Sequence, residues 1–209
     1  MATRIDGKAL AAKVKAQVAE AAKGLSRQPG LAVILVGNDP ASRVYVNGKD
    51  RDCAECGFVS FEHKLPAETS QETLLELIGR LNRDDAVDGI LVQLPLPGHL
   101  DEEAVLNAID PEKDVDCFHP VNVGRLVIGS PVFLPCTPAG VMEMLKEYDI
   151  PVRGKQCVVL GRSNIVGKPM GALLLQQDGT VITCHSRTPD LAKYTREADI
   201  LISAVGRVG

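Results

Sequence analysis

Short apolar runs of strand length alternate along this chain with segments of helical periodicity, and this alternation limits the possible folds more than any other feature. Leu31–Val36 and Gly89–Leu94 are near-continuous apolar runs, typical of strands buried on both faces, and Phe58–Leu65 alternates as a strand does. Helices are predicted at Pro40–Cys56 and after the capping box Thr69-Ser70-Gln71-Glu72. This alternation predicts a parallel sheet. Aromatic residues make up only 3% of the chain, so its core must be aliphatic.

A second series of the same kind follows. Thr137-Pro138 predicts a helix start, after the turn-rich residues 110–136. Further elements are expected as strands at Gln156–Leu160, Thr180–Cys184 and Ile200–Val205, with helices at Lys168–Gln176 and Leu191–Ala198. We therefore predict an α/β protein of two domains, a three-layer α/β domain over residues 1–136 and an incomplete Rossmann-like domain over residues 137–209. A doubly wound sheet usually has more strands than this second series, so we expect a longer protein.

Charge and hydropathy exclude several classes of function. The 209 residues include 23 Lys and Arg against 27 Asp and Glu, a net charge of −4, which argues against a broad nucleic-acid-binding face. No apolar run approaches the ~20 residues that span a bilayer, and the N-terminus resembles no signal peptide, so we expect a cytoplasmic protein without a membrane partner. The six cysteines predict buried thiols, and Cys53-x-x-Cys56 lacks a second pair, so no metal site is expected.

The segment Val158–Pro169 combines a strand, a glycine turn at Gly161 and a helix start. Such a turn offers free N–H groups to a phosphate, although an ordinary strand–helix turn would have the same pattern. Enzymes that prefer NAD place a carboxylate at the end of the next strand. Here Cys184–Thr188 contains none, whereas Arg162 and Arg187 suit a 2′-phosphate, so a bound dinucleotide should be NADP. The alternative is that both arginines are solvated surface charges.

The first domain contains a second group of polar residues. Tyr45 and Lys49 lie four residues apart, on one face of the predicted helix; a packed Tyr beside a Lys would have the same spacing. Gln93 interrupts an apolar strand at its carboxyl end, where open α/β sheets bind ligands. Asp114 and Asp116 follow in a loop, where acidic residues are usually solvated.

Five segments in this order have a specific family resemblance. They are Val36–Lys49, Asp88–Pro97, Pro111–Asp116, Pro135–Pro138 and Gly161–Pro169. With these motifs in register, residues 1–209 closely resemble the bifunctional methylenetetrahydrofolate dehydrogenase/methenyltetrahydrofolate cyclohydrolase (FolD) family. The resemblance implies NADP-dependent oxidation of 5,10-methylenetetrahydrofolate to 5,10-methenyltetrahydrofolate and its hydrolysis to 10-formyltetrahydrofolate. It also implies a folate-binding catalytic domain, an NADP-binding domain and a homodimer.

The resemblance assigns roles to individual residues. Lys49 is the expected catalytic lysine and Gln93 its partner, while Tyr45 stacks on the folate and Asp116 binds the pterin ring. Leu94 and Pro95 are expected to line the folate site. The expected NADP contacts are Gly161, Arg162, Ser163, Ile165 and Ser186. The residue types agree with the chemistry, because a neutral Lys49 amine could assist proton transfer during hydration without opposing a cationic substrate.

Two departures from the family pattern affect these expectations. Cys117 stands where the family has Gly after Asp116; if that position has positive φ, Cys would be strained and could shift Asp116. The family also continues beyond residue 209 with a segment that contributes to both sites. We therefore keep two alternatives, a cyclohydrolase without dehydrogenase activity and a non-catalytic folate- or nucleotide-binding module.

Overall fold

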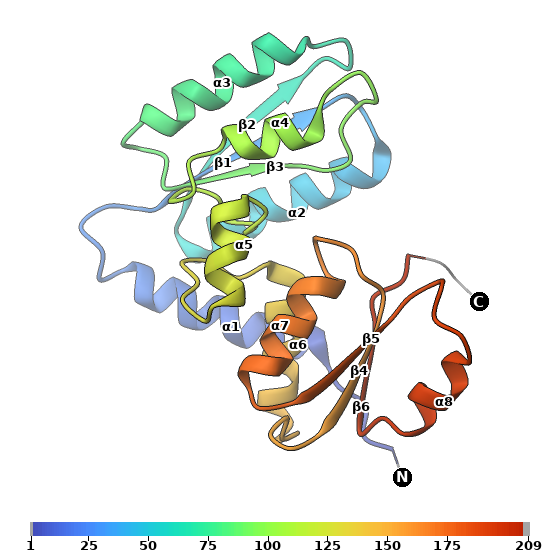
Figure 1. Cartoon of the computed structure of the whole chain (residues 1–209). Helices are drawn as coiled ribbons and strands as arrows, with labels where there is room; N and C mark the ends of the chain where they lie inside the picture. The colour runs from blue at the N-terminus through green and yellow to red at the C-terminus, as the bar shows by residue number, and fades with distance from the viewer. Residues whose placement is uncertain (1, 207–209) are drawn as a thin grey trace. The chain divides into compact units, whose positions relative to one another are not determined.

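The computed structural model describes residues 2–206, apart from the side chains of Ala41, Val44, Tyr45 and Asn47. The chain divides into two compact units, each with its own parallel sheet (Figure 1). The N-terminal unit extends from Asp6 to Val115, and the C-terminal unit begins at Asp116 and includes the first residues up to Ile5. The two units divide between Val115 and Asp116, before the domain boundary that the sequence predicted after residue 136. The predicted boundary therefore stays a prediction.

The N-terminal sheet has three parallel strands, because each strand is followed by a helix that returns the chain to the same edge. The strands are β1 (Gly30–Val36), β2 (Val59–Leu65) and β3 (Gly89–Val92), in the spatial order β2-β1-β3. Helix α2 (Pro40–Cys56) connects β1 to β2, and α3 (Gln71–Arg83) connects β2 to β3. All residues of β1 except Leu31 are buried, as predicted for a strand covered on both faces.

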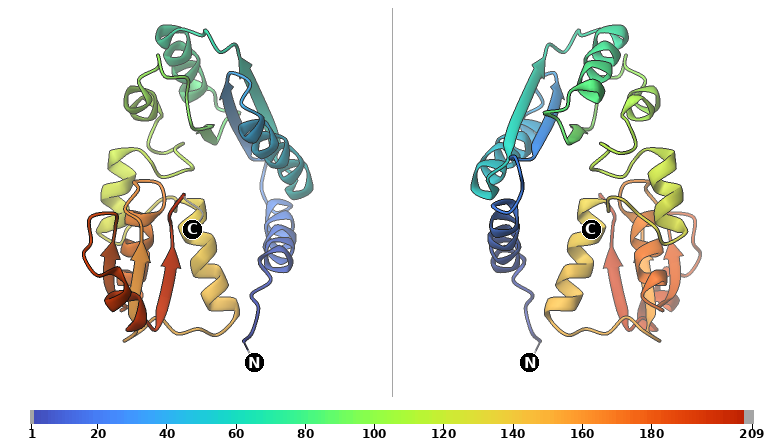
Figure 2. Two further views of the ribbon diagram at one scale, coloured as in Figure 1. Left: turned by 90° about the vertical axis from the view of Figure 1, so that its right-hand side faces the viewer. Right: turned by 90° about the vertical axis from the view of Figure 1, so that its left-hand side faces the viewer.

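Helices cover both faces of this sheet, which confirms the predicted three-layer arrangement (Figure 2). On one face, α3 and α4 (Glu102–Ala108) contribute completely buried side chains such as Leu74 and Val105. On the other face, Val46 of α2 packs with Leu35 of β1. The remaining helix, α1 (Gly7–Ala22), begins after Asp6, whose carboxylate caps its first turn.

The C-terminal unit repeats the parallel arrangement. Its elements are β4 (Gln156–Leu160), β5 (Thr180–Cys184), β6 (Ile200–Ser203), α5 (Pro120–Val127), α6 (Cys136–Glu147), α7 (Gly167–Gln176) and α8 (Leu191–Arg196). The strand order is β5-β4-β6, and the outer edges of β5 and β6 pair with no strand of the described residues. Val159 of the central strand packs with residues of α5, α6 and α7, among them Leu126, Leu145 and Met170. The predicted two-domain α/β class is confirmed.

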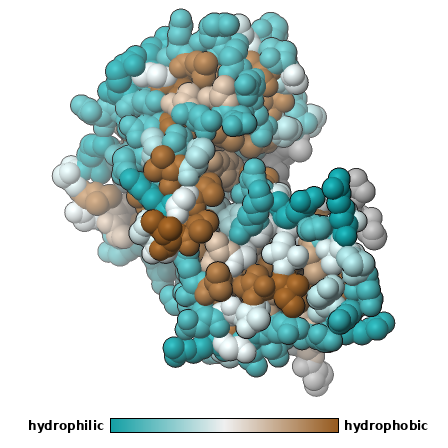
Figure 3. All heavy atoms as spheres, in the orientation of Figure 1, coloured by the Kyte–Doolittle hydropathy of each residue, from teal (hydrophilic) through white to brown (hydrophobic). Residues whose placement is uncertain are grey.

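Helix α5 lies in the segment that the sequence indicated only as turn-rich. Pro120 occupies its first turn, and the His119 ring accepts a hydrogen bond from the backbone N–H of Val121 at 3.2 Å. Leu126 is buried, whereas Val127 and Ile128 are 66% and 77% exposed. Figure 3 shows apolar side chains gathered on this part of the surface.

Two helix starts differ from the predicted ones. Ser70, rather than Thr69, caps α3, because the Thr69 hydroxyl donates instead to the carbonyl of Pro66 at 2.7 Å. Helix α6 begins at Cys136 and has no side-chain cap, so Thr137 lies inside its first turn. Sequence propensity does not decide which of several neighbouring residues starts a helix.

Three properties of the described residues bear on function. Five of the six cysteines are buried, Cys136 is exposed, and none forms a disulfide. In residues 2–206, no group of three or more His, Cys, Asp or Glu side chains is arranged to hold a metal ion. None of the helices in that range has the length and apolar content of a transmembrane span.

Candidate active site

Lys49 and Gln93 form a hydrogen-bonded pair at the carboxyl edge of the N-terminal sheet. Lys49 lies in the second half of α2, and Gln93 is the first residue after β3. The Lys49 Nζ donates to Gln93 Oε1 at 2.9 Å. Helical side chains lean toward the helix N-terminus, so Lys49 reaches back to the edge at which α2 begins.

The Gln93 amide is held by two further hydrogen bonds. Its backbone N–H donates to the carbonyl of Ile34 at 2.8 Å, which fixes the residue beside the central strand. Its side-chain Nε2 donates to the carbonyl of Leu94 at 2.8 Å. The amide nitrogen is therefore engaged, and Oε1 faces the lysine. An uncharged acceptor thus positions the amine without adding charge to the site.

The structure gives less detail for the other residues that are predicted to bind folate. Leu94 is half-buried and Pro95 exposed, and a cis peptide bond joins them. The backbone of Tyr45 belongs to α2, but its side chain lies outside the described residues. Asp116 is half-buried at the start of the C-terminal unit. The structure therefore brings Lys49, Gln93 and Leu94 together, and the roles of all six predicted folate-site residues stay predictions.

The loop before Asp116 is anchored on the N-terminal sheet. The backbone N–H of Ile90 donates to the carbonyl of Lys113 at 2.7 Å. The Lys113 ammonium donates to the carbonyls of Leu81 and Asp84 at 3.1 and 2.8 Å, which neutralises the C-terminal end of α3. Asp114 is only 2% exposed, whereas the sequence indicated a solvated loop carboxylate.

Cys117 adopts the left-handed conformation, so the condition under which a Cys at this position is strained is met. Its φ is +58°, and its side chain is 1% exposed in the core of the C-terminal unit. A residue with a Cβ is strained in this region by roughly 1–2 kcal/mol relative to glycine. Burial of the thiol among apolar side chains such as Leu126 offsets that strain.

The turn after β4 requires glycine at two positions. Gly161 has a φ of +117°, and a Cβ there would lie 2.4 Å from the carbonyl oxygen of Ala204. A Cβ at Gly167 would lie 2.3 Å from the carbonyl oxygen of Gly161. Between them, the Ser163 hydroxyl accepts from the backbone N–H groups of Val166 and Gly167 at 3.2 and 3.3 Å. Backbone therefore packs against backbone, as in turns that approach a pyrophosphate closely.

The residues around this turn fit NADP. The Gly161 N–H donates to the carbonyl of Cys184 at 2.8 Å, so the turn lies beside the end of β5. Arg162, Ser163 and Ile165 of the turn are exposed. After β5, Ser186 and Arg187 are exposed as well, and neither Arg162 nor Arg187 forms an ion pair with another described residue. Two available guanidinium groups at one sheet edge suit a 2′-phosphate.

Comparison with known families matches almost the whole chain. Residues 5–116 match the family model "Tetrahydrofolate dehydrogenase/cyclohydrolase, catalytic domain". Residues 135–209 match "Tetrahydrofolate dehydrogenase/cyclohydrolase, NAD(P)-binding domain". The chain is also 61% identical, over 206 residues, to the bifunctional protein FolD of Acetivibrio thermocellus, a match that covers 97% of this chain and 72% of that protein.

Solved structures give the same result. The bifunctional enzyme FolD of Campylobacter jejuni superposes with a TM-score of 0.96 at 50% identity, covering 99% of this chain and 74% of that one. The Trypanosoma brucei enzyme, complexed with NADP cofactor and inhibitor, superposes with a TM-score of 0.95 at 43% identity, covering 100% and 73%. With both domain models and these relatives in agreement, the chain belongs to the tetrahydrofolate dehydrogenase/cyclohydrolase family.

Proposed function

We propose that this chain oxidises 5,10-methylenetetrahydrofolate to 5,10-methenyltetrahydrofolate with NADP and hydrolyses the product to 10-formyltetrahydrofolate. The observation that carries the proposal is the Lys49–Gln93 hydrogen bond at the ligand-binding edge of the sheet, in a chain of this family. The reaction belongs to the one-carbon metabolism that supplies purine biosynthesis.

The pair would suit both reactions with Lys49 in its neutral form, because the Gln93 amide adds no charge. Loss of hydride makes the carbon between the two folate nitrogens cationic, and a permanent ammonium beside it would oppose that charge. A neutral Lys49 amine, oriented by Gln93 Oε1, instead accepts a proton from the water that adds to this carbon. The same amine then returns the proton to the ring nitrogen as the carbon–nitrogen bond breaks, while the formyl C=O forms and the remaining hydroxyl proton leaves to solvent.

The remaining folate contacts are proposed by family motif. Tyr45 would stack on the folate, with Leu94 and Pro95 lining the site. Asp116 would accept hydrogen bonds from the aminopyrimidinone edge of the pterin, because a carboxylate offers two coplanar acceptors. Cys117 fixes the backbone next to Asp116, and its burial supports a single conformation there.

Gly161, Arg162, Ser163, Ile165 and Ser186 would hold NADP. When bound, NADP accepts the hydride from the folate. The exposed Arg162 guanidinium would pair with the 2′-phosphate and Ser186 would donate a hydrogen bond to it. The glycines keep the turn free of side chains, so that the backbone approaches the pyrophosphate.

A spectrophotometric assay tests this proposal. Formation of methenyltetrahydrofolate with NADP, followed by its decay, supports both activities. Decay without NADP-linked formation would assign the cyclohydrolase alone, and absence of both signals would leave a non-catalytic folate- or nucleotide-binding module.

The variant Lys49→Met tests the catalytic lysine. We expect cyclohydrolase turnover to fall by roughly 10²–10⁴-fold, the usual contribution of a positioned proton-transfer group, with an unchanged far-UV circular dichroism spectrum. Lys23→Met, at the exposed end of α1, is the matched control and should keep wild-type turnover. Turnover at the wild-type rate in Lys49→Met would remove the lysine from the mechanism.

We infer further that the enzyme is a cytoplasmic homodimer that binds neither nucleic acid nor membranes. The net charge of −4 opposes binding to phosphate backbones and anionic lipids. Among the described residues the outer edges of β5 and β6 are unpaired, which favours association with a second copy. Light scattering after size-exclusion chromatography would give the dimer mass; a monomer at micromolar concentration would contradict the inference.

A further inference from the structure

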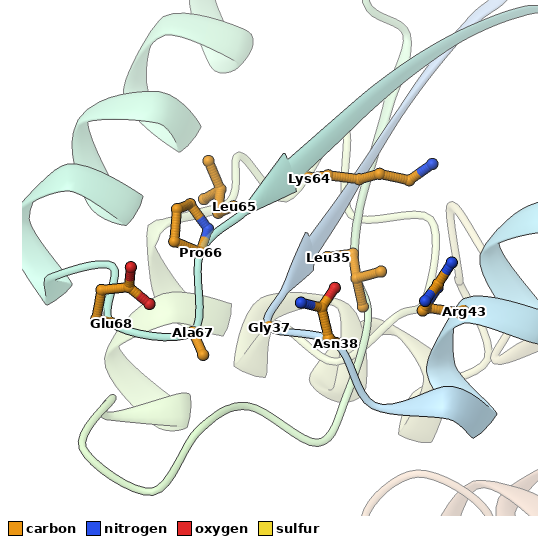
Figure 4. Close-up of a pocket in the computed structure, with 9 residues that line it drawn as sticks. All are labelled: Leu35, Gly37, Asn38, Arg43, Lys64, Leu65, Pro66, Ala67 and Glu68. Atoms are coloured by element: carbon orange, nitrogen blue, oxygen red, sulfur yellow. The ribbon is translucent and has the colours of Figure 1, made fainter.

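A cavity of about 490 Å³ opens at the carboxyl ends of β1 and β2 (Figure 4). It is lined by Leu35, Gly37, Asn38, Arg43, Lys64, Leu65, Pro66, Ala67 and Glu68. Neither Lys49 nor Gln93 belongs to this lining, so the cavity is separate from the pair described above. Gly37, Asn38 and Arg43 belong to the motif Val36–Lys49, but that motif assigned them no role.

The charged groups of the cavity are unevenly distributed. Figure 4 shows the cationic ends of Arg43 and Lys64 on one side and the Glu68 carboxylate on the other. Lys64 forms an ion pair with Glu62 at 2.8 Å, whereas Arg43 is exposed and pairs with no described carboxylate. The Arg43 side of the cavity therefore holds an available guanidinium, whose fork of N–H donors matches a carboxylate.

The cavity lies on the same sheet edge as the Lys49–Gln93 pair. In the order β2-β1-β3, the end of β1 separates the end of β2 from Gln93, so two strand spacings, roughly 10 Å, span the distance across the edge. Along α2, Arg43 precedes Lys49 by six residues, roughly 9 Å of helix. A ligand whose reacting atom lies beside Lys49 would therefore reach the cavity through a rigid spacer about as long as one aromatic ring.

We propose that this cavity binds the glutamate carboxylates of the folate substrate, with Arg43 as the main contact and Lys64 as the second. The proposal rests on the proposed function. A tetrahydrofolate carries its reacting carbon next to a benzoyl ring, and the ring carries an amide-linked glutamate. The glutamate carboxylates are the permanent negative charges of the substrate, and a cavity with a free cation one ring away is complementary to them.

The test compares substrates with one and three glutamates in the cyclohydrolase reaction, which needs no cofactor. For Arg43→Gln we expect KM for the triglutamate to rise about fivefold, the usual size of an exposed ion pair, with less change for the monoglutamate and unchanged kcat. Lys64→Gln should act in the same direction. Arg51→Gln, on the same helix but outside the cavity, is the matched control and should leave both KM values unchanged.

Salt provides a second readout, because exposed ion pairs are screened. The wild-type KM for the triglutamate should rise with ionic strength, and the Arg43→Gln KM should rise less. An unchanged KM ratio between the two substrates in Arg43→Gln would overturn the proposal.

Direct binding separates this proposal from the proposed function. Calorimetry with p-aminobenzoyl-triglutamate should show binding to the wild-type chain and weaker binding to Arg43→Gln, whether or not the chain is active. A chain that binds this fragment through Arg43 but hydrolyses neither substrate would overturn the proposed function alone. Inorganic phosphate that binds through Arg43 as tightly as the fragment would assign the cavity to a free anion and overturn the substrate-tail proposal.

Discussion

Replacement of Gly167 by alanine tests whether the turn after β4 must lack a side chain. A Cβ at this position would lie 2.3 Å from the carbonyl oxygen of Gly161, 2.5 Å from its carbonyl carbon and 2.8 Å from the backbone nitrogen of Arg162. All three are backbone atoms, so none moves aside by a side-chain rotation. The variant therefore folds only if the turn separates from the start of α7.

The size of the effect follows from these distances. The contact with the Gly161 oxygen is about 1 Å shorter than the ~3.3 Å of a close carbon–oxygen contact. Overpacking that moves the backbone costs roughly 1–3 kcal/mol, and we expect about 3 kcal/mol because every clashing atom is backbone. The free energy of unfolding should fall by that amount.

Gly171, one turn later on α7, is the matched control. A Cβ there would lie 3.6 Å from Val181 Cγ1 and 3.7 Å from Thr183 Oγ1, which are ordinary contacts. Gly171→Ala should therefore stabilise the chain by about 0.5–1 kcal/mol, because alanine is the better helix former.

Thermal unfolding followed by far-UV circular dichroism measures the difference. The two variants should differ by about 4 kcal/mol, or roughly 8–16 °C in Tm. NADPH fluorescence should show weaker binding to Gly167→Ala and unchanged binding to Gly171→Ala. Equal Tm values and equal NADPH binding for the two variants would refute the close approach of turn and helix.

Two further predictions concern single side chains. The Arg27 guanidinium holds the pKa of Asp88 below its usual range, so this ion pair stabilises the fold above the unfolded carboxyl pKa and is lost as pH falls through the lowered, folded value. Because both groups are about half exposed, Asp88→Asn should lower the free energy of unfolding by at most about 1 kcal/mol at pH 7. Urea titrations should find this difference shrinking as the pH falls below the usual carboxyl pKa, and a difference that stays constant would contradict the prediction. Burial raises the pKa of the Cys53 thiol, so peptide mapping after iodoacetamide treatment should find exposed Cys136 modified first; equal rates for the two would contradict the burial.

Strands β1, β3 and β4 were predictable because they are near-continuous apolar runs that are mainly buried in the structure. Strand β1, for example, begins within one residue of its expected start at Leu31 and ends as predicted. Helix α5 was missed because it spans only eight residues and starts at Pro120, among residues typical of turns. Its helical state depends on burial of Leu126 in the core of the C-terminal unit, which no local pattern indicates.

The residues of the candidate site were likewise predictable only in part. Gln93, Gly161 and Ser186 follow the ends of parallel strands, so their position at a sheet edge was predictable from the strand pattern alone. Lys49 lies inside a helix, and only the family motif indicated that it meets Gln93. The orientation of the Gln93 amide depends on its hydrogen bond to Leu94, which needs the folded loop.

Arg43 shows what sequence patterns leave out of such a site. It lies in the first turn of α2, whereas Lys64 lies near the end of β2, the strand that follows α2 in the sequence. Parallel pairing of β1 with β2 brings Lys64 level with Leu35, just before the residues that lead into α2, and so places both cations around one cavity. A cation in the first turn of a helix is unfavourable for the helix dipole, an effect that the Asp39 carboxylate at the N-cap opposes here. The cavity and the available Arg43 guanidinium, rather than the motif that contains Arg43, indicate an anion site here.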